Sequence, residues 1–360
     1  MTLLFRYLFR NNLQVILPTL AVGTGLYLLS DLFDRLDDIL EAGVPGNVAI
    51  WYFVAKTPLI ISQILPAVFL LAALIQLCLM SRDRELMALQ AGGVSFGAIA
   101  RFFVVYGLLW AVLQLGFSQV LGVAGERESA RIWQEQVRGR TPGTRDLTNV
   151  WFTDDNHVIH LEVVTPALRK GQGFAAYGLA ADGIHIDTVI RAKAFTGTAG
   201  TWKLQDVEVF STRDFGHAKL PEMSIAIGQD PQDFAVIDPG ADPQRLPLWQ
   251  LGDAVDKLRT AGSNVEGLRT AWHMKLAYAA SLVVMGLLAV AMVTWRDNIY
   301  LATGLALVFT FLFYTMFTIG STLGQKGIVS PPIAAWGADI LVGVVASARL
   351  LLVLRPRSLR

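Results

Sequence analysis

Long apolar stretches without charged residues follow one another along most of the chain. Five stretches contain no charge, and a sixth contains only Asp339. The stretches are 11–30, 57–81, 102–125, 276–295, 298–325 and 327–348. A membrane-spanning helix needs about 20 apolar residues, and each charge at the bilayer centre costs roughly 2.5–3.5 kcal/mol. The pattern therefore predicts six spanning helices, at about 12–31, 59–80, 97–121, 275–295, 299–320 and 333–354.

Two other interpretations fit this pattern less well. Buried core helices of a large soluble protein would have to be long and uncharged six times in one chain. A secretory signal at the N-terminus would have a shorter apolar run, followed by small residues at a cleavage site. Asp31-Leu32-Phe33 stands at that place instead. We therefore expect an uncleaved first helix.

The period of the pattern changes from helical to two inside segment 122–274. Alternating apolar positions predict strands in 158–163, 184–194 and 202–210, with a closing strand near 223–227. The apolar parity switches between Leu204 and Val207, which predicts a β-bulge near Gln205–Asp206. These short strands are typical of a small antiparallel sandwich or open roll. A Pro-rich stretch follows, and then an amphipathic helix that begins near Leu248 and ends at Gly262.

Composition supports a membrane protein and excludes several other classes. The 360 residues are 53% hydrophobic and only 16% charged, against roughly 25% charged in an average soluble domain. A formal net charge of +1 argues against nucleic-acid binding. The single cysteine, Cys78, excludes an internal disulfide framework and a Cys-rich metal site.

The distribution of Lys and Arg in short loops predicts the orientation. One side of the membrane would hold nine arginines: Arg6, Arg10, Arg82, Arg84, Arg101, Arg296, Arg355, Arg357 and Arg360. The opposite short loops hold only Arg35, Lys56 and Lys326. Because positive loops stay inside, we expect both termini and the 81–96 loop in the cytoplasm, and segment 122–274 outside.

Candidate chemistry within the chain is sparse. The sequence has no G-x-x-x-x-G-K-[ST] phosphate loop. His157 and His160 stand three apart on a predicted strand, so they point to opposite faces and do not suit a shared metal. Asp339 lies within the sixth span, where an ionisable residue is either a functional group or a hydrated position near the outer interface. A membrane enzyme that modifies lipids would need a cluster of such groups. A membrane-anchored envelope adaptor is the other alternative.

The loop between the second and third predicted spans has the most specific pattern. It reads Ser81-Arg82-Asp83-Arg84-Glu85-Leu86-Met87-Ala88-Leu89-Gln90-Ala91-Gly92-Gly93. Good helix formers closed by glycines predict a short helix. A charged beginning followed by adaptable apolar residues suits docking into a partner's cleft. A connector that lies on the membrane surface is the alternative.

This loop resembles the signature R-[DS]-x-E-L-x-x-[LM]-x-A-[SG]-G of the LptF/LptG (YjgP/YjgQ) lipopolysaccharide export permeases. The resemblance extends over nearly the whole chain. It includes Arg6–Tyr7, Leu65–Pro66, Ala130–Arg131, Trp202-Lys203-Leu204, Leu258 to Gly262, Lys275 and Ser330-Pro331-Pro332. Ala279 and Ala280 stand where the family pattern often has a proline, which weakens any claim of a kink there. The segment 327–332 is more similar to LptG than to LptF.

The resemblance implies a fold and a set of partners. The fold would have six transmembrane helices with an inserted periplasmic antiparallel β-jellyroll-like domain. The expected parts are helices one to three (1–121, with a coupling helix at 82–93), a helical extension (122–148), the β domain (149–230), a linker with an amphipathic helix (231–274) and helices four to six (275–360). The implied partners are a second permease, a cytoplasmic LptB-like ATPase dimer that carries ATP and Mg, and a single-span LptC-like jellyroll protein with its periplasmic bridge. Lipopolysaccharide would be the cargo, in the bacterial inner membrane, and this chain would carry no cofactor, no metal and no catalytic residue.

The resemblance also directs attention to particular residues. The coupling to the ATPase is expected from Arg82, Arg84, Glu85, Leu86, Met87 and Leu89. Arg35, Lys56 and Arg131 are candidates for contact with lipid phosphates, although positively charged snorkelling would give the same pattern. Leu26, Leu29 and Phe33 are candidates for a lateral opening between the first and fifth spans.

Overall fold

The structure, a computed structural model, contains two compact units. It describes residues 3–139, 146–154, 156–180, 185–198, 200–212, 216–231, 246–260, 265–294 and 299–354. One unit comprises 1–138, 244–248 and 266–360, and the other comprises 139–243 and 249–265. The predicted helix end at Gly262 and four of the predicted cytoplasmic arginines, Arg296, Arg355, Arg357 and Arg360, lie outside the described residues.

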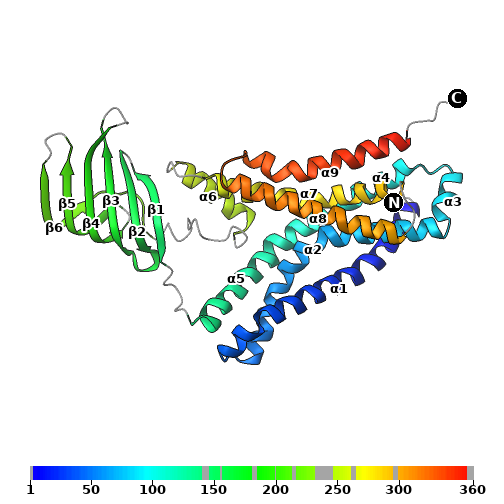
Figure 1. Cartoon of the computed structure of the whole chain (residues 1–360), viewed down its shortest axis with the longest axis horizontal. Coiled ribbons are helices and arrows are strands. Elements are labelled where there is room, and N and C mark those ends of the chain that lie inside the picture. Colours follow the sequence, from blue (N-terminus) through cyan, green and yellow to red (C-terminus); the bar gives the residue numbers. More distant parts are fainter. Residues whose placement is uncertain are drawn as a thin grey trace. The chain divides into compact units, whose positions relative to one another are not determined.

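Six long helices form the first unit (Figure 1). They are α1 (Leu3–Glu41), α2 (Gly46–Arg82), α4 (Phe96–Phe117), α7 (Glu266–Val293), α8 (Ile299–Gln325) and α9 (Pro331–Leu354). The helix of α4 continues without a break through a π turn (Ser118–Gly122), α5 (Val123–Ile132) and a second π turn (Trp133–Val137). All six are long and apolar enough to cross a membrane, which confirms the six predicted spans. The helices extend beyond the predicted spans because polar residues at their ends continue the helical backbone.

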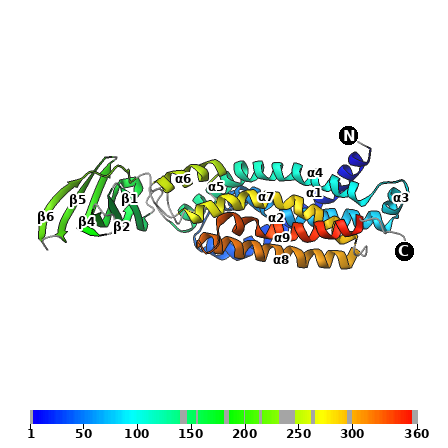
Figure 2. The same cartoon turned by 90° about the horizontal axis from the view of Figure 1, so that it is seen from above.

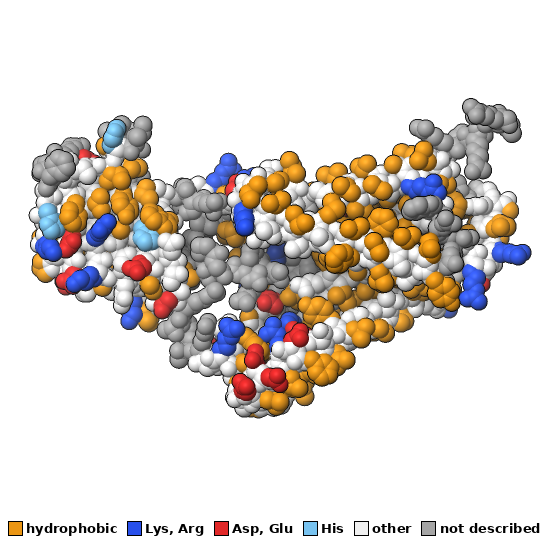
Figure 3. All heavy atoms as spheres, viewed as in Figure 1, with side chains coloured by type: hydrophobic (Ala, Val, Ile, Leu, Met, Phe, Trp, Pro, Cys, Tyr) orange, Lys and Arg blue, Asp and Glu red, His pale blue; other side chains and the backbone are white. Residues whose placement is uncertain are grey.

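The helices differ in how much of their surface lies inside the unit. Two thirds of the apolar windows of α2 and α7 are buried, whereas less than a third of the windows of α1, α8 and α9 is buried. Phe69, Phe103 and Tyr106 fill the centre with fully buried rings. Hydrophobic side chains cover much of the visible face of this unit in Figure 3, and charged side chains gather at its ends. This distribution is the one expected of a bundle whose solvent is lipid.

Small residues allow α8 and α9 to approach closely. A methyl group at Gly320 would collide with the carbonyl oxygen of Ala334, and one at Gly324 would lie 2.7 Å from the Ala334 methyl carbon. Gly324 also faces Thr270 of α7. The pair Gly320 and Gly324 therefore acts as a small-xxx-small contact in this structure.

The second unit contains one six-stranded antiparallel sheet (Figure 2). Its strands are β1 (Leu147–Asp154), β2 (His157–Thr165), β3 (Lys170–Leu179), β4 (Ile186–Thr198), β5 (Thr201–Ser211) and β6 (His217–Ile225). They pair in sequence order, β1 to β6, so the sheet is a meander. The predicted strands at 158–163, 184–194 and 202–210 are confirmed as β2, β4 and β5, and the closing strand begins earlier than expected.

The sheet is curved, and side chains of its apolar face pack together around Trp202. This ring is fully buried and contacts the rings of Phe152, Phe174 and Phe195, which come from β1, β3 and β4. The contact between Phe152 and Trp202 joins the first and fifth strands, so the sheet curls as an open roll would. The helix α6 (Leu248–Thr260) follows as expected, with Leu251 fully buried.

A row of unusual backbone conformations crosses this sheet. Asn149 on β1, Gly173 on β3 and Asp206 on β5 all have φ between 52° and 68°. The pairing registers place them in one row, with Glu162 of β2 and Lys193 of β4 between them. We call this row the crease.

The crease corrects one prediction. The parity switch between Leu204 and Val207 is present, since both side chains are buried. However, the register of β5 against β4 is the same on both sides of Asp206, because Gln205 pairs with Ala194 and Val207 with Ala192. The predicted bulge with an extra residue is therefore wrong. The left-handed conformation of Asp206 rotates the strand without inserting a residue.

Candidate functional site

The loop predicted to dock a partner contains a short helix, α3 (Glu85–Ala91), at one end of the helical unit. We call this end the α3 end and the opposite one, where α1 turns into α2, the hairpin end. Arg84 precedes α3 with φ of 59°, and Gly93 follows it with φ of 87°. Both joints thus leave the right-handed helical region, which sets α3 apart from the long helices on either side.

The candidate coupling residues divide into an exposed and an inward group. Arg82, Arg84 and Met87 are exposed, and Met87 keeps 67% of its surface accessible. Leu86 is only 5% exposed and belongs to the core of the bundle, with Leu89 half-buried against the same core. Leu86 and Leu89 therefore hold α3 on the bundle, and Arg82, Arg84 and Met87 form the surface available to a partner.

Glu85 contacts Tyr7, a pairing that the sequence did not suggest. The hydroxyl of Tyr7, in the second turn of α1, donates a hydrogen bond of 2.7 Å to Oε2 of Glu85. The first helix and α3 are therefore joined directly, although 78 residues separate the two positions.

Two of the three candidate phosphate-binding residues meet at the hairpin end around Asp31. Lys56 Nζ lies 2.7 Å from Asp31 Oδ1 and 2.8 Å from Oδ2. Arg35 Nε lies 3.1 Å from the same Oδ1. The guanidinium group of Arg35 also stacks 4.4 Å from the ring of Trp133, a cation–π contact. Two cations, one from α1 and one from α2, thus bind the same carboxylate.

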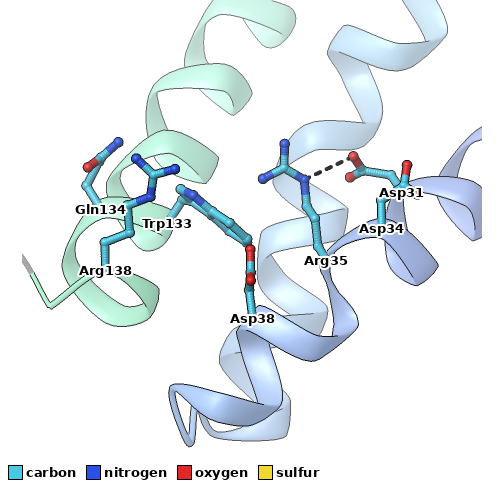
Figure 4. A pocket seen from close by; sticks show the side chains of 7 residues that line it. All are labelled: Asp31, Asp34, Arg35, Asp38, Trp133, Gln134 and Arg138. Atoms are coloured by element: carbon cyan, nitrogen blue, oxygen red, sulfur yellow. Dashed lines mark hydrogen bonds and ion pairs between the residues drawn. The ribbon is translucent and has the colours of Figure 1, made fainter.

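A polar cavity of about 400 Å³ opens beside this cluster. It is lined by Asp31, Asp34, Arg35, Asp38, Trp133, Gln134 and Arg138. Figure 4 shows Arg35 directed toward Asp31, while Trp133, Gln134 and Arg138 project from the facing helical segment. Three carboxylates and two guanidinium groups mean that an anion entering here would compete with resident acidic side chains.

The third candidate cation, Arg131, is placed separately on α5. Its guanidinium group is 2.7 Å from Glu128 Oε1 and 3.6 Å from Glu135 Oε2, and its side chain is 58% exposed. The sequence separation of three and four residues explains this pairing, because such residues are neighbours on a helix. All three candidate cations are therefore already engaged by carboxylates.

The three candidates for a lateral opening lie on one exposed part of α1. Leu26 and Phe33 are about two-thirds exposed and Leu29 is half exposed. The fifth span, α8, also presents large apolar side chains: Leu307, Val308, Phe311 and Ile319. Each helix thus offers apolar surface that must be covered by lipid, cargo or another protein.

Asp339 is buried inside the bundle. Only 4% of its surface is accessible, and neither carboxylate oxygen has a hydrogen-bond partner among the described residues. It lies on the buried side of α9 with Ala335, Ala338 and Val342. Its role stays a hypothesis.

A comparison with protein families decides the relationship. The family model of the lipopolysaccharide export system permease LptF/LptG matches residues 6–352. The chain belongs to the LptF/LptG family. No curated protein matches the sequence significantly.

The match relates both structural units of this permease to the function of its family. It covers all six long helices and the inserted sheet, so both units belong to the family's common design. LptF/LptG proteins are the permease of the lipopolysaccharide export system. The family model describes both LptF and LptG, so the similarity of 327–332 to LptG stays a prediction.

Proposed function

We propose that this permease is the membrane subunit of an ATP-driven transporter, which extracts lipopolysaccharide from the bacterial inner membrane and passes it to a periplasmic bridge. The observation that carries the proposal is α3: a short helix on the bundle end, with Met87, Arg82 and Arg84 exposed around Glu85. Because the sequence contains no phosphate loop, the nucleotide chemistry would belong to a cytoplasmic ATPase dimer that docks there.

The orientation follows from the same end. The α3 end also holds Arg6 and Arg10, so the positive-inside rule would place it in the cytoplasm with both termini. The hairpin end and the β unit would then face the periplasm. A second permease of the family, an LptC-like single-span protein and the bridge complete the proposed assembly. The outermost strands β1 and β6 have unpaired edges in the described sheet, which suits pairing with similar domains.

Transport of this cargo requires that its acyl chains stay in contact with apolar surface after they leave the bilayer. Each CH₂ that leaves the bilayer costs about 0.8 kcal/mol unless apolar surface replaces lipid. The exposed apolar surface of α1, including Leu26, Leu29 and Phe33, would supply part of that contact. Lipid phosphates would be attracted by Arg35, Lys56 and Arg131 once they displace the resident carboxylates.

The test is purification of the full chain with its partners from the native membrane. Glu85→Lys is expected to abolish co-purification of ATP-hydrolysing activity and lipopolysaccharide release. Lys326→Glu is the matched control, because it reverses an exposed charge in the loop at the hairpin end. A Glu85→Lys complex with normal ATPase content and normal export would refute the proposal.

A further inference from the structure

A hydrogen bond between Tyr7 and Glu85 joins the side chains of α1 and α3 directly. Its length of 2.7 Å is that of a hydroxyl bound to a carboxylate, which is stronger than a bond between neutral groups. Tyr7 is 44% exposed, so the bond lies at the rim of the bundle and not in its core. The hydroxyl of Tyr7 is therefore bound to Glu85 at the surface of the bundle.

The short helix α3 is built to shift as one piece. Non-helical joints at Arg84 and Gly93 bound its seven residues. Small elements between such joints can turn with little internal change. Leu86 inserts into the bundle core, so a turn of α3 would take place about this side chain.

The beginning of α1 is held on several sides. Gln76 of α2 donates from Nε2 to the carbonyl oxygen of Leu8 at 3.0 Å, and its Oε1 accepts from Asn12 Nδ2 at 2.9 Å. Both amide side chains are fully buried. On the α4 side, the rings of Phe5 and Phe102 meet edge to face at 4.9 Å. A displacement of Tyr7 therefore moves a well-packed segment and not a loose end.

The rest of α1 reaches from the α3 end toward the hairpin end, where the ion pair of Asp31 with Lys56 joins it to α2. Its 39 residues extend over about 58 Å at 1.5 Å per residue. The middle and far parts contact chiefly α2 and expose Leu26, Leu29 and Phe33. Pro18 lacks a backbone N–H, so one helical hydrogen bond is missing just after the anchored segment and α1 can bend there.

We propose that Tyr7 is a positioning residue for coupling: its hydroxyl ties α1 to Glu85, so that a displacement of α3 by the ATPase moves the helix that borders the cargo. This inference rests on the proposed function, because it assumes that an ATPase docks on α3. It adds to that function a specific contact through which movement of the docking helix reaches α1. Neither the loop signature nor the arrangement of the six helices indicates this contact.

The experiment uses the full complex reconstituted with lipopolysaccharide in vesicles. Tyr7→Phe removes only the hydroxyl group. Tyr27→Phe is the matched control, since it removes the same atom from α1 about five and a half turns further along. The readouts are bound ATPase, ATP hydrolysis, and lipopolysaccharide released per ATP hydrolysed. A spin-label pair at Leu40 and Ile319, both exposed, reports the movement of α1 against α8 in a Cys78→Ala background.

We expect Tyr7→Phe to keep ATPase binding and hydrolysis while export per ATP falls about fivefold or more, the scale of a typical coupling energy. The nucleotide-dependent change in the Leu40–Ile319 distance should disappear. Unchanged export per ATP with an unchanged distance response would overturn the inference and leave the proposed function intact. Loss of ATPase binding in Tyr7→Phe would also overturn it, because Tyr7 would then be part of the docking surface. A wild-type complex without any ATPase would refute the proposed function itself.

Discussion

Asp31 of α1 holds the ammonium group of Lys56 of α2 with both carboxylate oxygens, at 2.7 and 2.8 Å. Both side chains are nearly buried, with 12% and 13% of their surfaces accessible. The same carboxylate binds Arg35, so one acidic residue balances two cations at the hairpin end. This arrangement fixes the α1–α2 hairpin, and it also means that any incoming phosphate must exchange with Asp31.

The exchange can be tested with Asp31→Asn. The substitution leaves Arg35 and Lys56 without their shared carboxylate, so we expect stronger binding of lipopolysaccharide phosphates, by up to about tenfold for about 1.4 kcal/mol of relieved competition. Cross-linking of lipopolysaccharide from a photoreactive residue at position 29 measures the change. Asp37→Asn, at an exposed position of the same helix, is the control. Equal cross-linking in the two variants would argue that these cations do not meet phosphate.

Leu86 and Met87 are neighbours with opposite expected effects. Leu86→Ala removes a buried side chain, so it should lower the free energy of unfolding by about 2–4 kcal/mol, with a lower melting temperature of the purified chain. Met87→Ala should leave the melting temperature unchanged, because this side chain is exposed, but it should weaken ATPase binding. A loss of stability in Met87→Ala comparable to that in Leu86→Ala would contradict the assignment of inward and outward faces.

Because α8 and α9 are in close contact, replacing glycine by alanine should affect stability very differently at two positions of α8. Gly320→Ala should destabilise the bundle by about 1–3 kcal/mol, because the new methyl group collides with the Ala334 carbonyl. Gly304→Ala meets no atom within 4 Å and should be neutral or stabilising by up to about 1 kcal/mol. Thermal unfolding in detergent separates the two, and equal melting temperatures would show that the helices are not in contact at Gly320.

The pairing of β5 and β6 has a predicted dependence on pH. Lys219 Nζ lies 2.6 Å from Glu208 Oε1, and this hydrogen bond and charge lower the pKa of Glu208 below its ordinary value of 4.5. A lowered pKa gives stability that is present above the ordinary value and is lost as the pH falls through the lowered one. Carbon NMR of labelled glutamate in the full chain should show a Glu208 pKa that returns toward 4.5 in Lys219→Met. An unchanged pKa would mean that this ion pair does not form in solution.

The helical bundle could be predicted because membrane-spanning helices are recognised from the composition of long apolar stretches. A run of about twenty apolar residues with no charge or a single one is rare outside membrane spans, so the sequence pattern predicts all six spans, including the sixth with its single Asp339. Three strands could be predicted for a similar reason, since alternation marks a half-buried strand. β1 and β3 lack such clean alternation, because the left-handed residues Asn149 and Gly173 interrupt it in mid-strand. β5 is interrupted in the same way at Asp206, but its apolar residues alternate on both sides of that position.

The contacts of the candidate site were harder to predict. The arginines and Met87 around α3 stand out by their types, but nothing in the sequence pairs Tyr7 with Glu85, because the partner is 78 residues away. Asp31 and Arg35 are four residues apart on a helix, so their ion pair had a local signal, which Lys56 and Trp133 lack. Long-range partners depend on how helices assemble, and that information is not contained in local periodicity.

The crease restricts how the strands can shift against one another and where residues can be inserted or deleted. A slip of one residue in any strand turns its apolar side chains outward. A slip of two preserves the alternation but carries Asn149, Gly173 or Asp206 away from the row where the neighbouring strands accommodate a left-handed backbone. The alignment is thus locked by two unrelated requirements, and insertions or deletions in relatives of this chain should be confined to the turns between strands.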